Sequence, residues 1–167
     1  MQVSTPTSIR QAEGVREVAL ARALFEEYAA WLNEDLCFQG FAEELATLPG
    51  SYTPPRGRLL LASAGEDVIG CIALRPLSDA THDDDSTLVG EVKRLYVKPS
   101  ARGRGIARDL ATRLIDDARA IGYRTLKLDT LERMHAALTL YESLGFTRCT
   151  PYYHNPLGSP VYLSLDL

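Results

Sequence analysis

Hydrophobic side chains recur with helical spacing along several stretches of the chain. In residues 13–32 they lie three, four and seven positions apart, which is typical of an amphipathic helix. A second long helix is predicted by an apolar stripe, two residues wide, that ends just before Gly122, because glycine commonly caps the C-terminus of a helix. The stripe consists of Ile106, Ala107, Leu110, Ala111, Leu114, Ile115, Ala118 and Ile121. Shorter helices are predicted over residues 38–48 and 132–144, where Pro49-Gly50 and Gly145 end the pattern.

Shorter apolar runs between turn residues predict strands. The first two runs are separated by Gly65-Glu66-Asp67, which has the length and composition of a hairpin turn. From residue 88 to residue 144 the order is strand, helix, strand, helix, and this order implies a parallel strand pair inside a mixed sheet. The sequence therefore predicts an α/β (α+β) fold whose strands cover residues 58–64, 68–74, 88–97, 126–129, 146–152 and 161–166.

Length and composition narrow the class of protein. A chain of 167 residues, 46% hydrophobic and 24% charged, is expected to form a single domain over residues 1–167, without repeats or linkers. The first ten residues are polar and no apolar run approaches the ~18 residues of a membrane span, so we expect no export signal and no membrane segment. Cys37, Cys71 and Cys149 show no pairing pattern and are expected to be buried, reduced thiols of a cytoplasmic protein.

The net charge argues against nucleic-acid binding, and the spacing of the possible ligands argues against a metal site. The net charge is −4, and the positive charge concentrates in residues 93–124, which contain nine basic and three acidic side chains. Such a balance gives no support to nonspecific nucleic-acid binding. His82, His135 and His154 are scattered, and the run Asp83-Asp84-Asp85 lacks the alternating ligands of a calcium loop, so no metal is expected.

A glycine-rich segment joins the strand predicted at 88–97 to the long helix that ends at Ile121. In Arg102-Gly103-Arg104-Gly105 the glycines allow a tight turn, consecutive N–H groups converge, and the helix N-terminus adds its positive dipole end. This pattern fits an anion site, although an ordinary helix start has the same composition. No Lys-Ser or Lys-Thr follows, so the segment is not a P-loop, and Arg108 breaks the dinucleotide-binding spacing.

With two flanking blocks, this segment resembles the GCN5-related N-acetyltransferase (GNAT) superfamily. The blocks occur in the family's order and span residues 88–146: Glu91-Val92-Lys93-Arg94-Leu95-Tyr96-Val97, then Arg102-x-x-Gly105-x-Ala107, then Ala137-x-x-Leu140-Tyr141-Glu142-x-x-Gly145-Phe146. The resemblance implies a GNAT-like sheet that is mostly antiparallel, contains a central splayed parallel pair and is flanked by about four helices. It also implies acetyl-CoA as cosubstrate, with no metal.

The resemblance assigns cofactor-binding roles by position. The backbone of Leu95, Tyr96 and Val97 would bind the pantetheine arm, while their side chains pack. One position departs from the family, since Met134 stands where many relatives carry an asparagine that contacts the cofactor. The loop that would hold the pyrophosphate through its backbone N–H groups consists of Arg102, Gly103, Arg104, Gly105, Ile106 and Ala107.

Two side chains are predicted to move protons. An alkyl ammonium with a pKa of about 10 must lose a proton before it attacks. The resemblance implies Glu91 as the base, because some family members have a catalytic glutamate at this position of the strand; the alternative is that Glu91 pairs with a nearby arginine or lysine. Tyr141 falls where the family often has its general acid, and a phenol is protonated at neutral pH. The alternative for Tyr141 is packing of its ring within an apolar stripe.

The acceptor is less narrowly predicted than the cofactor. The acidic first half would form the acceptor side and attract a cationic amine, through Glu34, Asp35, Glu43 and Glu44, with aromatic walls from Trp31, Tyr28, Tyr152 and Tyr153. The alternative is that the acidic residues lie on the solvated faces of two helices and that the aromatic residues belong to the core. We expect acceptor specificity in residues 152–156, a small-molecule or peptide amine as acceptor, and a homodimer through the last strands as one permitted assembly. The alternative function is a noncatalytic acyl-CoA-binding or regulatory domain.

Overall fold

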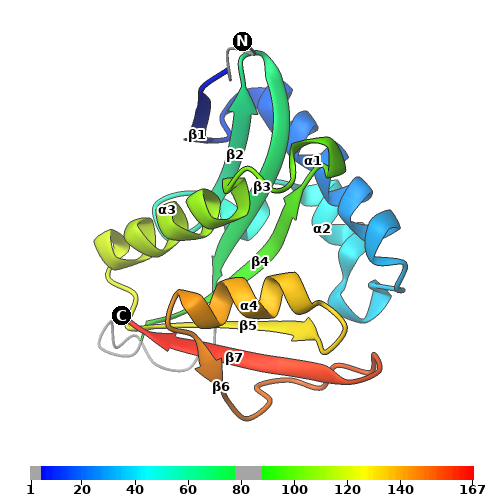
Figure 1. Ribbon diagram of the computed structural model, residues 1–167, viewed down its shortest axis with the longest axis vertical. Coiled ribbons are helices and arrows are strands. Elements are labelled where there is room, and N and C mark those ends of the chain that lie inside the picture. The colour runs from blue at the N-terminus through cyan, green and yellow to red at the C-terminus, as the bar shows by residue number, and fades with distance from the viewer. Residues whose placement is uncertain (1–4, 78–87) are drawn as a thin grey trace.

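The computed structural model describes residues 5–77 and 88–167, whose elements are shown in Figure 1. Their strands form one seven-stranded sheet in the order β1-β2-β3-β4-β5-β7-β6. Every neighbouring pair is antiparallel except β4 and β5, which run parallel. The helices and strands are β1 (Thr7–Gln11), α1 (Gly14–Leu32), η1 (Cys37–Gln39), α2 (Phe41–Thr47), η2 (Gly50–Tyr52), β2 (Arg58–Ala64), β3 (Asp67–Pro76), β4 (Val89–Val97), η4 (Pro99–Ala101), α3 (Ile106–Ile121), β5 (Thr125–Leu131), α4 (His135–Ser143), β6 (Thr147–Arg148) and β7 (Pro160–Asp166).

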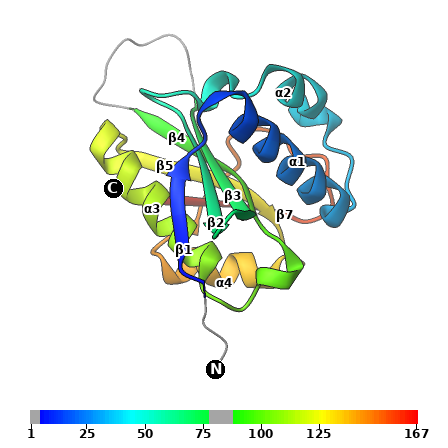
Figure 2. The same ribbon diagram turned by 90° about the horizontal axis from the view of Figure 1, so that it is seen from above.

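Helices cover both faces of the sheet, with α1 and α2 on one side and α3 and α4 on the other (Figure 2). Side chains of the central strands alternate between the two layers, because successive residues of a strand point to opposite faces. Leu60 and Ile72 pack in the cluster that contains the apolar stripe of α3 and Tyr141 of α4. Leu59 and Leu61 pack against Phe25 of α1 in the other cluster. The sheet thus separates two hydrophobic cores.

Glycines in left-handed conformations bracket α3. Gly105 precedes the helix with φ of 79°, and Gly122 follows it with φ of 107°. Residues with a Cβ rarely adopt this conformation, so glycine is suited to both ends. The Gly122 N–H donates to the carbonyl groups of Ala118 and Arg119, at 3.1 Å each, and so caps the last turn.

The parallel pairing between β4 and β5 is short. It extends only from Val89 opposite Thr125 to Glu91 opposite Lys127. Further along, β4 contains an irregularity against β3, where Arg94 has a positive φ of 60°. Beyond the paired residues β5 continues beside β7 while β4 follows β3, and the two strands part (Figure 1). This gap lies in the middle of the sheet.

The predicted fold class is confirmed: the sheet is mixed and mostly antiparallel, with a splayed parallel pair and four α-helices among the described residues. Several boundaries differ by a few residues, and three differences have a clear physical cause. Strand β1 was not predicted, because at the sheet edge its side chains are largely exposed and lack an apolar alternation. Helix α4 begins at His135 rather than at 132, since the Met134 N–H closes a turn on the Leu131 carbonyl.

The third difference is β6, which was expected over residues 146–152 and contains only Thr147–Arg148. One further backbone bond follows, from the Cys149 N–H to the Tyr162 carbonyl, and Pro151 lacks the N–H that would continue the pairing. A long loop therefore leads from β6 to β7. It carries residues 152–156.

Other sequence predictions are located as follows. No helix within residues 5–77 and 88–167 is long and apolar enough to cross a membrane. Cys71 is buried as expected, whereas Cys37 is exposed because it lies in a surface turn before α2. His82 and the run Asp83-Asp84-Asp85 lie outside the described residues.

Candidate active site

A pocket occupies the gap where β4 and β5 part. Its walls include α4 from one face of the sheet and α1 from the other, so the pocket reaches both faces through the gap. The strands contribute both apolar and charged side chains. It is lined by Tyr28, Leu32, Leu36, Gln39, Val92, Lys93, Arg94, Leu95, Leu128, Asp129, Thr130, Leu131, Met134, Ala137, Tyr141, Asn155 and Leu157.

Tyr141 of α4 lines this pocket and is almost fully buried. Its ring packs edge-on against Phe146, with the centroids 5.3 Å apart. No residue in the described ranges forms a hydrogen bond with its hydroxyl group. Burial raises the pKa of the phenol, so it stays protonated at neutral pH. The ring of Tyr141 is therefore packed in the core, as the alternative interpretation of this residue predicts. Its hydroxyl group is a proton donor without a partner among the described residues.

Glu91 lies on the paired part of β4, and its side chain is only 2% exposed. Arg75 Nε donates to Oε2 at 2.7 Å, and the Tyr152 hydroxyl donates to Oε1 at 3.1 Å. Lys93 Nζ lies 3.7 Å from the same Oε1. The ion pair named as the alternative for Glu91 is thus present. Glu91 is not among the residues that line the pocket, whereas its neighbour Lys93 is.

Lys93 is a buried lysine in the pocket wall. Besides Glu91, its ammonium group contacts Gln39 Oε1 at 3.3 Å. Burial lowers the pKa of Lys93 to about 8, and the nearby Arg94 contributes in the same direction. Lys93 is therefore able to exist in its neutral form close to physiological pH.

Arg94 occupies the irregular position of β4 and is buried. Its Nε donates to Glu44 Oε2 at 2.9 Å and its Nη1 to Gln39 Oε1 at 2.8 Å. The guanidinium lies over the Phe41 ring, 5.1 Å from the centroid, and 5.8 Å from that of Tyr28. Its Nη2 is enclosed and has no hydrogen-bond partner in the part of the chain that the structure describes.

Asp129 faces the pocket from β5, just beyond the last residue paired with β4. Its Oδ2 accepts hydrogen bonds from the Tyr153 hydroxyl and from Asn155 Nδ2, the latter at 2.8 Å. Gln39 Nε2 in turn contacts the Tyr153 hydroxyl at 3.2 Å. Two groups from the loop before β7 thus hold the carboxylate in place, while Oδ1 has no partner among residues 5–77 and 88–167.

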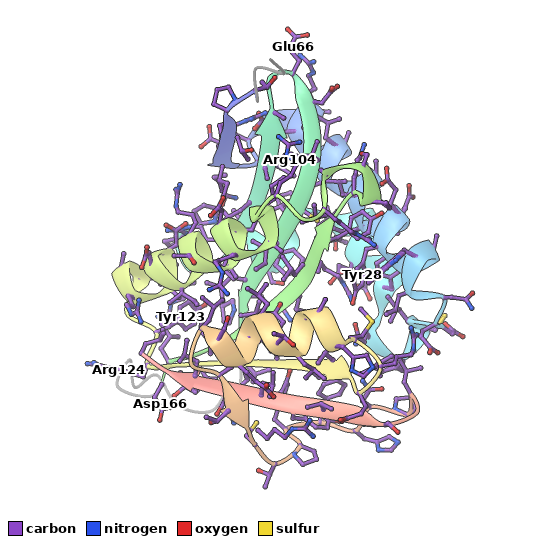
Figure 3. The ribbon with its side chains drawn as sticks, viewed as in Figure 1. Tyr28, Glu66, Arg104, Tyr123, Arg124 and Asp166 are labelled. Carbon is purple, nitrogen blue, oxygen red and sulfur yellow. The ribbon has the colours of Figure 1, made fainter. Side chains whose placement is uncertain are left out.

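The glycine-rich loop has the geometry of an anion site. Gly103 and Gly105 have φ of 76° and 79°, and the space where a Cβ would stand is open at both. The amide groups of residues 103–108 donate no hydrogen bond within the described structure, and the first helical bond runs from the Asp109 N–H to the Gly105 carbonyl. Arg104 lies beside the beginning of α3, as Figure 3 shows. The backbone of this loop is therefore free to bind an anion.

The other predicted cofactor residues divide by role. Leu95 lines the pocket, whereas the side chains of Tyr96 and Val97 pack in opposite cores, as expected. Arg102 turns away from the loop, because its Nε donates to the Val97 carbonyl at 2.9 Å and its guanidinium lies 4.6 Å from the Trp31 ring centroid. Met134 lines the pocket.

Sequence reasoning missed the polar residues that face the acceptor side of the gap. They are Gln39, Lys93, Arg94 and Asp129. The available signal was three charged residues within four positions of a largely buried strand, Glu91, Lys93 and Arg94, because charged residues are rarely buried unless they are paired. Asp129 gave no such signal, since it continues the alternation of polar and apolar residues that begins at Thr125.

Comparisons with known proteins agree with this geometry. The model of the acetyltransferase (GNAT) family matches residues 19–146. An uncharacterized N-acetyltransferase of Schizosaccharomyces pombe is 35% identical, over 87% of this chain and 86% of its own, and one of Dictyostelium discoideum is 32% identical, over 95% and 99%. A solved Salmonella typhimurium acetyltransferase with its cofactor acetyl-CoA has a TM-score of 0.66 at 23% identity, covering 96% of this chain and 94% of its own.

The family match covers well over half of the residues, and both N-acetyltransferases align along most of their length. The chain therefore belongs to the GNAT family of acetyltransferases. The prediction of an acyltransferase of the N-acetyltransferase class is confirmed by these relatives.

Proposed function

We propose that this protein transfers the acetyl group of acetyl-CoA to a primary amine of a small molecule or peptide, by direct transfer within a ternary complex. The observation that carries the proposal is the pocket through the split sheet, which has an uncommitted phenol at α4 and charged groups toward α1. A thioester that enters from one face and an amine that enters from the other would meet in the gap between β4 and β5.

The thioester would be held mainly by backbone groups. The unpaired amides of residues 103–108 and the N-terminus of α3 are suited to the pyrophosphate. Beyond Glu91, β4 has no strand neighbour on its β5 side, so the backbone groups of Leu95 to Val97 that point to this side would bind the amide groups of the pantetheine arm, apart from the Val97 carbonyl, which accepts from Arg102. The solved Salmonella protein, whose fold is similar, contains acetyl-CoA.

The acceptor ammonium must lose a proton before its nitrogen attacks the acetyl carbonyl carbon. Because Glu91 is enclosed, we propose that neutral Lys93 takes this proton at the pocket wall and that Glu91, 3.7 Å away, stabilises the resulting ammonium. The lowered pKa of Lys93, about 8, suits an exchange of this kind. Glu91 would then act as a base through Lys93 rather than by direct contact.

The leaving group needs a proton as the C–S bond breaks. Tyr141 is the proposed donor, since its protonated hydroxyl lines the pocket without another partner. A C–N bond forms, the C–S bond breaks and the sulfur leaves as CoA thiol. The second nitrogen proton passes to the Tyr141 phenolate and Lys93 releases the first proton to solvent, which restores both residues. The net reaction converts an ammonium ion and acetyl-CoA into an amide, CoA and one proton.

The second candidate is a noncatalytic acyl-CoA-binding or regulatory domain. The enclosed carboxylate of Glu91, already held by Arg75 and Tyr152, favours it, since a structural ion pair needs no reaction. Both candidates require acetyl-CoA binding, and only the enzyme releases CoA when an amine is added.

The test begins with calorimetric titration of the purified protein with acetyl-CoA, with free CoA for comparison. Micromolar binding followed by amine-dependent CoA release supports the enzyme, and binding without release for any amine supports the regulatory domain. Initial rates at varied concentrations of both substrates should give intersecting lines, and intact mass should show no acetylated enzyme. Parallel lines or an acetylated cysteine would contradict direct transfer.

A further inference from the structure

The acceptor side of the pocket presents opposite charges on its two strands. Asp129 projects from β5 with one oxygen fixed by Tyr153 and Asn155 and the other uncommitted. A carboxylate oriented in this way by a supporting loop, with one oxygen open, is suited to bind a primary ammonium group. This position lies just past the point where β5 leaves β4, so an amine bound there is close to the gap.

The wall opposite Asp129 holds donors that lack an acceptor. Arg94 Nη2 is buried and unpartnered within the described residues, and a buried charged donor without an acceptor lowers stability. Tyr28 lines the same pocket, its ring centroid lies 5.8 Å from the Arg94 guanidinium, and no described residue accepts the proton of its hydroxyl group. Burial keeps the Tyr28 phenol protonated by raising its pKa. An incoming anion that displaces the phenol slightly would reach both donors.

Below the pKa of Lys93, about 8, where this lysine is protonated, the charges around the pocket are balanced before any acceptor binds. Three cations and three carboxylates form the cluster, namely Arg75, Lys93, Arg94, Glu44, Glu91 and Asp129. The negative charge of Asp129 also acts on the opposite wall. It partly offsets the lowering of the Lys93 pKa by burial, and it adds to the raising of the Tyr28 pKa by burial. A ligand of net charge zero leaves this balance intact, whereas a simple cation or anion adds charge to a buried site, which is costly.

We propose that the acceptor is a zwitterion of the amino acid type, whose ammonium group binds Asp129 and whose carboxylate binds Tyr28 and Arg94. The inference rests on the proposed function and narrows its substrate class from any primary amine to one with a free carboxylate. Peptide amines and polyamines, which lack a carboxylate beside the amine, are poor substrates under this proposal.

The first test compares matched acceptors by CoA release at fixed acetyl-CoA. The probes are the common L-amino acids, their carboxamides, the corresponding decarboxylated amines and short peptides. We expect at least one free amino acid to exceed its carboxamide by about tenfold or more in kcat/KM, or 1.4 kcal/mol. Equal or better turnover of carboxamides, plain amines or peptides overturns the proposal while the N-acetyltransferase function stands. Lack of turnover with every probe overturns both.

The second test uses single-atom changes on the two walls. Tyr28→Phe removes only the hydroxyl, and it should lower the acid-to-carboxamide ratio of kcat/KM toward one. Asp129→Asn keeps the hydrogen-bonding shape, and it should raise KM for acid and carboxamide alike without changing their ratio. Tyr123→Phe is the matched control, because Tyr123 lies far from Tyr28 (Figure 3) and donates to the Arg56 carbonyl. An unchanged ratio in Tyr28→Phe contradicts the carboxylate site, whatever the effect on KM.

Discussion

At the scale of single residues, Tyr141 combines a packed ring with a hydroxyl group that nothing in the described structure uses. Such a group contributes little to folding, because no hydrogen bond is lost when it is removed. The proposed role of the hydroxyl group in proton transfer is therefore separable from the packing of the ring. This separation of roles makes the residue a clean target for substitution.

Tyr141→Phe is expected to lower kcat by at least about tenfold, since general acid catalysis contributes about 10²–10⁴ in rate. The dissociation constant of acetyl-CoA and the melting temperature should remain close to those of the parent protein. Steady-state CoA release and calorimetry measure these quantities. Tyr123→Phe, which lies just after the end of α3 and does not line the pocket, serves as the control. A kcat of Tyr141→Phe equal to that of the parent protein would contradict the assignment of Tyr141 as the general acid.

Lys93 gives a prediction for the pH dependence of kcat. Burial lowers its pKa to about 8, and only its neutral form accepts a proton. Below that pH the lysine is protonated, so kcat should rise about tenfold per pH unit and become constant above about 8. Lys93→Gln should remove this step, whereas Lys98→Gln, which alters a more exposed lysine paired with Glu27, should retain it. A step that persists in Lys93→Gln would assign it to another group.

The residue scale also shows where sequence reasoning stops. Tyr141 and the glycines of the loop were predictable because a motif fixes their positions in the family. The surroundings of Glu91 were not, since Arg75 and Tyr152 lie 16 and 61 positions away and meet it only in the folded sheet. Asp129 was missed for the same reason, because its fixing partners belong to a loop beyond α4.

At the scale of elements, periodic patterns predicted the long helices and the central strands. The stripe of α3 is the clearest case, since buried positions recur every three to four residues and glycine stands at both ends. Elements without a buried stripe were not predictable in this way. Strand β1 and the two-residue β6 depend on pairing with a neighbour, which tertiary structure supplies.

The loop before α3 is tested by Gly105→Glu, which we expect to raise the dissociation constant of acetyl-CoA more than tenfold. The new carboxylate would occupy the open space at the helix N-terminus and repel the pyrophosphate. Gly14→Glu is the matched control, because Gly14 also has a positive φ, an open Cβ position and a place at a helix start. Both variants carry about 1–2 kcal/mol of backbone strain, so a difference in binding reports the charge. Equal weakening in both would contradict the assignment of the loop.

At the scale of the whole molecule, charge is divided unevenly along the chain. Residues 93–124 contain nine of the 18 basic side chains and include the glycine-rich loop, although the protein carries −4 overall. A local positive field of this kind attracts a polyanionic cofactor without giving the protein general affinity for nucleic acid. The division is visible in the sequence, and in the fold the basic segment runs from β4 through the glycine-rich loop and along α3.

Salt should therefore weaken acetyl-CoA binding. The screening length falls from about 30 Å at 0.01 M to about 3 Å at 1 M ionic strength, so the dissociation constant should rise several-fold over this range. Acetyl-pantetheine, which lacks the phosphates, is the control ligand and should show little salt dependence. A salt-independent dissociation constant for acetyl-CoA would place its phosphates away from the basic segment.

The short pairing of β4 with β5 has a consequence for amide hydrogen exchange. Only three residues of β4 have partners on β5, so alternate amides between Val92 and Val97 point into the gap while their neighbours bond to β3. Protection from exchange should alternate along this half of one strand, although it lies at the centre of the sheet where protection is ordinarily uniform. Acetyl-CoA bound in the gap would accept hydrogen bonds from these open amides and protect them from exchange. The exchange pattern of β4 alone would then show where the thioester arm lies.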